Sequence, residues 1–222
     1  MMDTIIKILE RYGTVYIQGL AGTLWLAAIT VVLGTAVGTL LAVLRLSRVR
    51  VFQWFVKAYV WVLRGTPILL QLYFFWIFLP KVMPFSLSDT ACIIVALIIN
   101  ASSYVAEIIR AGIQAVDKGQ TEAARSLGLT AGHTMSKVVL PQAVKNILPA
   151  LGNEFINMIK QVSLASVFFI NELTTSYRTV LAATYRPIEA IVIAGMIYLL
   201  VTTVLSQIVE LAEWRMRKNE RC

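Results

Sequence analysis

"LAGTLWLAAITVVLGTAVGTLLAVL", residues 20–44, contains no charged side chain. An α-helix rises about 1.5 Å per residue, so about twenty apolar residues cross the roughly 30 Å hydrocarbon layer of a membrane. This run is therefore long enough to span, and residues 190–209 form a second charge-free run. The composition agrees with them: 58% of the 222 residues are apolar and the mean hydropathy is +0.75, which is typical of a membrane protein.

Three more apolar segments carry charges but remain long enough to cross the membrane. They are residues 51–79, 88–109 and 141–170. Because the apolar runs are continuous rather than alternating, they predict helices and exclude a membrane β-barrel. The sequence therefore predicts an all-α integral membrane protein with five transmembrane helices in a single domain, residues 1–222. The spans are expected at about residues 19–45, 52–79, 88–112, 141–162 and 188–213.

A further helix is expected before the first span. Apolar side chains that include Ile5, Leu9, Tyr12 and Tyr16 fall on one side of a helix, and charged residues lie between them. This pattern predicts an interfacial helix over residues 1–18 on the outer membrane surface.

The basic residues predict the orientation. If the spans alternate in direction, thirteen basic residues share one side: Arg45, Arg48, Arg50, Lys57, Arg110, Lys118, Arg125, Lys137, Lys145, Arg215, Arg217, Lys218 and Arg221. Five share the other: Lys7, Arg11, Lys81, Arg178 and Arg186. The positive-inside rule makes the richer side cytoplasmic, with the N-terminus outside and the C-terminus inside. The net charge of +8 then faces anionic lipid and requires no nucleic-acid partner.

A polar stretch, "QTEAARSLGLTAGHTMSKVVLPQA" (residues 120–143), interrupts the apolar chain. Most of it belongs to a cytoplasmic loop expected over residues 113–140. Thr121 is expected to cap a short helix, and Gly128 to end that helix in the left-handed conformation. Thr130 is expected to cap a second helix that runs to Val139. The sequence thus predicts two short helices with a sharp bend between them.

The first of these helices has a small apolar face made by Ala123, Ala124 and Leu127. Such a helix often lies against its own bundle or against lipid. Alternatively, the groove of another protein can close over the face. Both interpretations fit the pattern.

The same stretch resembles the EAA loop of the membrane subunits of ABC importers. That pattern is E-A-A, a Gly four residues after the last Ala, and an apolar residue before Pro about a dozen residues later. The matching positions are Glu122, Ala123, Ala124, Gly128, Leu140 and Pro141. The resemblance implies a type I ABC importer permease fold, in which this loop forms a coupling helix that docks into a groove on a separate cytoplasmic ATPase.

Flanking stretches are similar to the polar amino acid uptake permeases, the histidine, arginine, glutamine and glutamate group. They are "RGTPILLQLYFFWIFLP" (64–80), "YVAEIIRAGIQAVDKGQ" (104–120), "LPALGNEFINMIKQVSLASV" (148–167) and "ELTT" (172–175). The resemblance runs from Gly19 to about Glu213. One departure is visible: the family commonly has an Asp-Thr or Ser-Thr pair where this chain has Gln161 and Val162.

The resemblance implies the partners. The chain has no G-x-x-x-x-G-K-[ST] phosphate loop, so no cofactor is expected in it, and ATP and Mg²⁺ belong to a cytoplasmic ABC ATPase dimer. The other partners implied are a second permease subunit, identical or paralogous, an extracytoplasmic amino acid-binding protein, the amino acid itself and membrane lipid. The expected location is the bacterial cytoplasmic (inner) membrane, and the chain is expected to be a permease subunit rather than an enzyme.

Polar residues within the spans are candidates for substrate binding, because an ionisable group inside a membrane is costly unless it faces water or a partner. The fourth span offers Glu154, Asn157, Lys160 and Gln161 along one polar stripe. Glu154 is expected to meet an ammonium or guanidinium group, which favours a basic amino acid. Alternatively, it pairs with Lys160 or with the second subunit.

Candidates in the second and third spans are Gln71, Asn100 and Tyr104. Pro67 is expected to break the second span, because it lacks a backbone donor and disfavours helical geometry at the preceding residue. Glu107 has Arg110 three residues later, which predicts a local ion pair rather than a ligand contact.

Two other function classes fit the sequence less well. A transporter or channel driven by an ion gradient often shows inverted repeats, but the sequence has no internal repeat and five spans cannot form two equal halves. A membrane-embedded hydrolase would need a nucleophile with a base or paired carboxylates. His133 stands alone on a cytoplasmic helix, so no metal site is expected.

Overall fold

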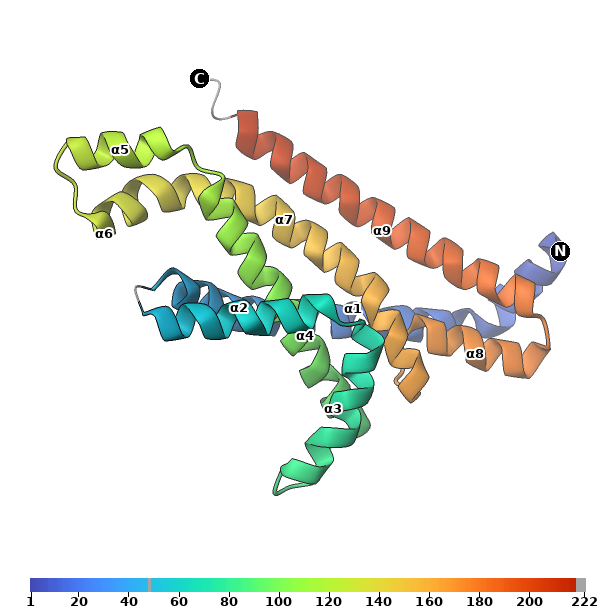
Figure 1. Ribbon diagram of the computed structural model, residues 1–222. Coiled ribbons are helices and arrows are strands. Elements are labelled where there is room, and N and C mark those ends of the chain that lie inside the picture. The colour runs from blue at the N-terminus through green and yellow to red at the C-terminus, as the bar shows by residue number, and fades with distance from the viewer. Residues whose placement is uncertain (48, 219–222) are drawn as a thin grey trace.

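The computed structural model describes residues 1–47 and 49–218, so Arg48, Arg221 and Cys222 lie outside the described residues. All the regular elements of the described residues are helices (Figure 1). Its elements are α1 (Met2–Leu46), α2 (Arg50–Gly65), α3 (Ile68–Val82), α4 (Asp89–Gln114), α5 (Lys118–Ser126), α6 (Ala131–Thr134), the π-helical segment η1 (Met135–Val139), α7 (Leu140–Gln161), the 3-10 segment η2 (Val162–Phe168), α8 (Leu173–Thr184) and α9 (Pro187–Lys218).

Three described helices are long and apolar enough to cross a membrane: α1, α4 and the part of α9 from Pro187 to Met216. The pair α2 and α3 would make a fourth span if it is counted as one, although a bend of 110° separates its halves. The predicted break is confirmed, because Thr66 is extended (φ −118°, ψ 147°) and α3 begins after Pro67.

The predicted fourth span, residues 141–162, is not among these candidates. Its helix α7 exists, but Lys145, Glu154 and Lys160, together with several amide side chains, lower its hydropathy. By length and composition, the described residues therefore give three or four candidate spans rather than five.

The N-terminal segment differs from the prediction. Residues 1–18 do not form a separate interfacial helix, because α1 runs unbroken for 45 residues. The apolar side that was expected to face lipid is partly covered by protein: Tyr16 packs with Leu173 of α8 and Ala190 of α9, whereas Leu9 is exposed. The Tyr16 hydroxyl also donates to the Ala190 carbonyl at 3.0 Å. Packing on α8 and α9 therefore stabilises this segment as a continuation of the helix that forms the first span.

Small residues let α1 approach α4 closely. A Cβ atom added at Gly38 would lie 2.7 Å from the Val105 Cβ and 2.8 Å from the Ser102 carbonyl oxygen. One added at Gly34 would lie 2.8 Å from the Ala101 Cβ. Interfaces between membrane helices rely on such close packing, because lipid is as apolar as the side chains themselves.

The main buried cluster joins α1, α3, α4, α7 and η2 through Leu26, Leu72, Leu97, Met158 and Val162. In Figure 1, α7 and α9 run side by side, and α5 and α6 extend beyond the bundle at the end where α9 finishes. The fold thus places a compact helical projection at one end of a membrane bundle.

Candidate functional site

The elbow, defined as residues 117–139, contains the stretch that resembles the EAA loop. Its first arm is α5, which begins after Asp117, whose carboxylate accepts the Gly119 N–H at 2.7 Å. The prediction that Thr121 caps this helix is wrong, because Asp117 provides an earlier acceptor and the helix is already formed at Thr121.

The bend of the elbow is at Gly128, as predicted. Gly128 has φ +84°, in the left-handed region where a Cβ is strained. The Gly128 N–H donates to the Arg125 carbonyl at 3.0 Å, and the Leu129 N–H donates to the Ala124 carbonyl at 3.1 Å. The Arg125 side chain then donates to the Leu129 carbonyl at 2.7 Å. These bonds close α5 and fix the direction in which the chain leaves it.

The second arm of the elbow begins at Thr130, as predicted, and the Thr130 hydroxyl accepts the His133 N–H at 3.3 Å. No break follows Val139, because helical residues continue from Ala131 through η1 into α7. Leu140 and Pro141 are the first residues of α7 and not a boundary between two helices. The elbow is therefore continuous with a helix of the membrane bundle.

The predicted apolar face of α5 is only partly correct. Ala124 is 5% exposed and packs inside the elbow, whereas Glu122 and Ala123 are exposed and Leu127 is 84% exposed at the tip. The Gln142 side chain of α7 braces the elbow, donating to Gln120 Oε1 at 3.4 Å and to the Val138 carbonyl at 3.0 Å. The face available to another protein thus combines a carboxylate with small and apolar side chains.

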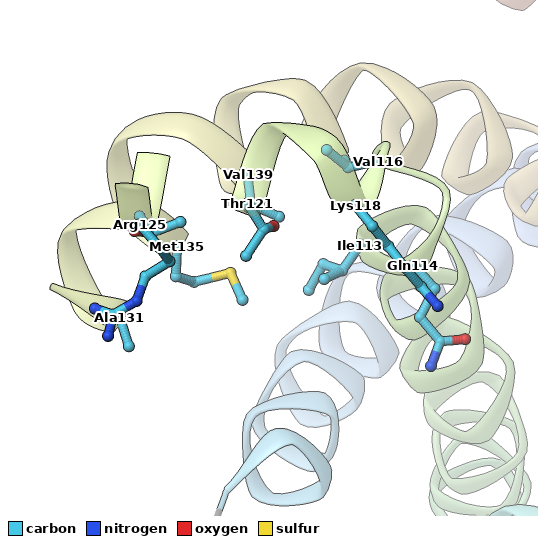
Figure 2. A pocket seen from close by; sticks show the side chains of 10 residues that line it. Ile113, Gln114, Val116, Lys118, Thr121, Arg125, Ala131, Met135 and Val139 are labelled. Atoms are coloured by element: carbon cyan, nitrogen blue, oxygen red, sulfur yellow. The ribbon is translucent and has the colours of Figure 1, made fainter. Parts of the chain in front are cut away.

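A cavity of about 730 Å³ lies inside the bend of the elbow. Figure 2 shows Thr121, Met135 and Ile113 pointing into it from α5, η1 and the end of α4. Lys118 and Gln114 lie on its α4 side. The α5 arm is therefore separated from the end of α4 by an open cavity.

Within the bundle, Gln71 and Asn100 are brought together. The Asn100 side-chain amide donates to Gln71 Oε1 at 2.8 Å, and Gln71 donates to the Leu63 carbonyl at 2.7 Å and to the Thr66 hydroxyl at 2.8 Å. Both amides are buried. Gln71 satisfies the Leu63 and Thr66 carbonyls at the break before Pro67, and Asn100 holds Gln71 in place, which explains how an irregular segment is tolerated there.

Glu154 is 6% exposed, and among the described residues its Oε1 atom has no hydrogen-bond partner. The Gln161 Oε1 atom is likewise without a partner in the described chain. Asn157 and Lys160 are exposed, and Lys160 lines a different hollow with Tyr198 and Tyr177. Glu154 forms no ion pair within residues 1–47 and 49–218, so the alternative pairing with Lys160 does not occur there.

The predicted ion pair between Glu107 and Arg110 is present. The other partners of Glu107 are distant in the sequence and were not predicted from it. The Arg45 guanidinium, 62 positions away, donates to Glu107 at 2.9 Å, and Arg64 lies 3.9 Å from the same carboxylate. The Arg64 guanidinium also stands over the Tyr104 ring, 5.2 Å from its centroid. Tyr104, a predicted substrate-binding residue, therefore lies against the cationic side chain of Arg64.

A buried carboxylate that was not predicted from the sequence caps the start of α8. Glu172 is fully buried and accepts the N–H groups of Thr174 (2.8 Å) and Thr175 (2.5 Å) and the Tyr198 hydroxyl (3.0 Å). An acidic residue before two threonines at a helix start is a signal that could have identified this N-cap.

Across the described residues, no three His, Cys, Asp or Glu side chains gather as metal ligands. The His133 Nδ1 lies 2.9 Å from the Thr130 hydroxyl.

A family model described as "Binding-protein-dependent transport system inner membrane component" matches residues 34–218. The chain belongs to this family. The permease is therefore a multi-pass inner membrane component with the all-helical permease fold, and the prediction of a transport subunit rather than an enzyme is confirmed. A binding-protein-dependent system of the ABC type also implies a binding protein and an ATPase as partners.

Curated relatives resemble the permease over nearly its full length. The arginine transport system permease protein ArtQ of Bacillus subtilis (strain 168) is 38% identical over 92% of this chain and 93% of that protein. The nopaline transport system permease protein NocM of Agrobacterium fabrum is 38% identical over 90% and 86%. The putative glutamine transport system permease protein GlnP of Rickettsia conorii is 33% identical over 99% and 100%.

Solved structures of ABC transporters contain chains with the same fold. The crystal structure of an amino acid ABC transporter with histidines contains a chain that is 41% identical and superposes with a TM-score of 0.89, covering 93% of this chain and 96% of that one. A chain of the inward-facing MetNI methionine ABC transporter gives a TM-score of 0.71 at 18% identity, over 97% and 99% of the two chains. The second similarity supports the fold alone.

Proposed function

We propose that this permease is the membrane subunit of an ATP-driven importer of polar amino acids, and that the elbow couples it to a separate cytoplasmic ATPase. The similar proteins named for arginine, nopaline and glutamine support the substrate class. The observation that carries the proposal is the elbow itself, which exposes Glu122 and Leu127 on a braced bend at one end of the bundle. A projection that couples two proteins must be both exposed and rigid.

The helix that continues from the elbow provides the route into the membrane. Residues 131–161 are helical without interruption, from α6 through η1 to α7. A force on the tip near Leu127 therefore acts on α7, which carries Glu154, Asn157 and Gln161. The π-helical turn at Met135–Val139 is the weakest part of this path, because its hydrogen bonds depart from the regular α-helical pattern.

The transport cycle follows from this arrangement. An extracytoplasmic binding protein delivers the amino acid to a pathway formed by two permease subunits, each contributing five helices with α7 as the fourth span. Closure of the two ATPases draws the two elbows together and switches the pathway from inward-facing to outward-facing. Reopening releases the amino acid into the cell. No bond of the substrate is broken, and ATP and Mg²⁺ act on the partner.

The substrate site is proposed around the buried Glu154. The Glu154 Oε1 atom has no hydrogen-bond donor in the described chain. A buried acceptor without a donor lowers the stability of the folded protein by about 1–3 kcal/mol. The α-ammonium or guanidinium group of a substrate would supply both a donor and the opposite charge. Because only a basic amino acid carries a cationic side chain, a contact of this side chain with Glu154 would favour a basic substrate. Asn157 and Gln161 would add hydrogen bonds from the same helix, with Lys160, Asn100, Gln71 and Tyr104 as the further candidates.

The coupling proposal is tested by reversing the charge at Glu122. We expect Glu122→Lys to lower recovery of the ATPase with the permease, and amino acid-stimulated ATP hydrolysis, by about tenfold or more, because a charged interface contact is worth about 1.5–3 kcal/mol. The measurement is co-purification from native membranes followed by an ATPase assay.

The matched control is Glu10→Lys, an exposed carboxylate near the start of α1. It makes the same charge change far from the elbow along the sequence, and recovery of the ATPase should stay at the level of the unaltered permease. If Glu122→Lys retains full recovery and full stimulated hydrolysis, the elbow does not couple the two proteins.

A further inference from the structure

Cations and tryptophans alternate along one exposed stripe of α2. The stripe consists of Arg50, Trp54, Lys57, Trp61 and Arg64, at successive steps of four and three residues. Steps of this size place side chains on one helix face. All five are exposed, with Trp54 at 73% and Trp61 at 77%. The proposed import cycle assigns no role to this surface.

The packing of α2 explains why the stripe faces outward. Val56, Val60 and Leu63 are buried, and Val56 and Val60 form a small cluster with Leu41 of α1 and Ala106 of α4. The helix is therefore amphipathic, with one apolar side that belongs to the bundle. Its remaining surface presents long cations beside indole rings.

The stripe ends at a hollow of about 470 Å³ between α1, α2 and α4. Arg45, Lys57, Trp61, Arg64, Tyr104 and Glu107 are among the side chains that line it. Glu107 already interacts with Arg45 and Arg64, and Arg110 pairs with it from the next turn of α4. Three arginines thus share one carboxylate, and Lys57 lies in the same hollow.

The charge in this hollow is therefore not balanced by the described chain. The side chain of Arg64 remains 42% exposed although it approaches Glu107, and Lys57 is exposed. Arginine binds phosphate oxygens through paired N–H donors, and lysine binds them as a point charge. The hollow has the donors and the positive charge for a phosphate group.

We propose that this hollow and the stripe bind the head group of an anionic phospholipid. The phosphate would contact Arg64 and Lys57, and the indole ring of Trp61 would lie at the level of the glycerol, where amphipathic rings are favoured. The alternation of tryptophan with cations argues for a lipid rather than a free phosphate ion, because a free ion has no apolar part for an indole ring to contact. The proposed orientation puts the site at the inner leaflet, where anionic lipids attract basic residues.

The experiment measures lipid binding by the transport complex, purified in neutral detergent and stripped of lipid. Native mass spectrometry counts the adducts formed with phosphatidylglycerol and, separately, with phosphatidylcholine of the same acyl chains. Lys57→Gln should weaken phosphatidylglycerol binding about fivefold, which corresponds to about 1 kcal/mol for each basic residue. The double variant Lys57→Gln with Arg64→Gln should weaken it further, and phosphatidylcholine binding should not change.

The matched control is Arg215→Gln, an exposed arginine of α9 on the same predicted side of the membrane. It should bind phosphatidylglycerol like the unaltered complex. Equal binding of the two lipids, or full phosphatidylglycerol binding by Lys57→Gln, would overturn the proposal. So would displacement of phosphatidylglycerol by an equimolar amount of inorganic phosphate, which would show that the site takes the ion alone. Because the readout is binding, failure here leaves the proposed import function unaffected.

Discussion

At the scale of single residues, the buried carboxylate of Glu154 is the most informative position in the permease. A carboxylate that is 6% exposed and has one oxygen without a partner in the described chain is costly to keep unless it serves a purpose. Sequence analysis identified the position from charge in an apolar segment. Only the packing of the helices could separate Glu154, which is buried, from Asn157 and Lys160, which are exposed.

Substitution of Glu154 tests its role in transport. We expect Glu154→Gln to reduce uptake roughly 10- to 100-fold, because it removes a charged hydrogen-bond acceptor worth about 1.5–3 kcal/mol to a cationic substrate. The amide is nearly the same size and easier to bury, so assembly and basal ATP hydrolysis should not change. Uptake of labelled amino acid into proteoliposomes measures the effect.

The control for this substitution is Asn153→Ala, the exposed neighbour on α7. It should transport within about twofold of the unaltered permease, since an exposed substitution usually changes little. If Glu154→Gln transports with unchanged KM and maximal rate, Glu154 has no part in substrate binding.

At the scale of the elements, the contact between α1 and α4 organises the bundle. Sequence analysis treated residues 19–45 as an apolar span and gave no role to its glycines. In the structure, Gly34 and Gly38 allow the backbones of the two helices to approach, with Ala101 and Val105 opposite them. Periodicity cannot find this contact, because it depends on which helix lies next to which.

This packing predicts a loss of stability for Gly38→Ala. Its Cβ would meet the Val105 side chain and the Ser102 carbonyl within 2.8 Å, so α1 must move away from α4. Overpacking of this kind costs about 1–3 kcal/mol and should lower the Tm by about 2–10 °C. Thermal unfolding of the purified permease in detergent measures it.

Gly13→Ala is the control on the same helix, because its Cβ would have no neighbour within 4 Å. Alanine favours helix over glycine by up to about 1 kcal/mol, so the Tm should stay level or rise slightly. Equal Tm values for the two variants would contradict the close contact of α1 with α4.

At the scale of the whole molecule, the uneven distribution of basic residues predicts how the permease sits in the membrane. A cysteine that replaces Met2 should react with a membrane-impermeant maleimide added to intact spheroplasts. A cysteine that replaces Arg215 should react only after the membrane is permeabilised. Both residues are exposed. Both variants need Cys222→Ser, while the native Cys92 is buried and should not react.

The same reagent also supplies the control, because Cys92 alone should remain unlabelled in either condition. Labelling of the Arg215 position in intact spheroplasts, with protection of the Met2 position, would reverse the orientation that the positive-inside rule gives.

The sequence by itself determined what local chemistry dictates. Hydropathy set the membrane class, Pro67 set the break between α2 and α3, and Gly128 and Thr130 set the bend of the elbow. Each depends on a residue and its nearest neighbours along the chain, so a linear pattern was enough.

The tertiary structure decided everything that depends on distant partners. It joined residues 1–18 to the first span by packing Tyr16 on α9, and it completed the ion cluster of Glu107 with Arg45. It also turned Ala124 inward and left Leu127 outside. A helix has several faces of similar composition, and which of them is buried is decided by the neighbours that the fold brings to it.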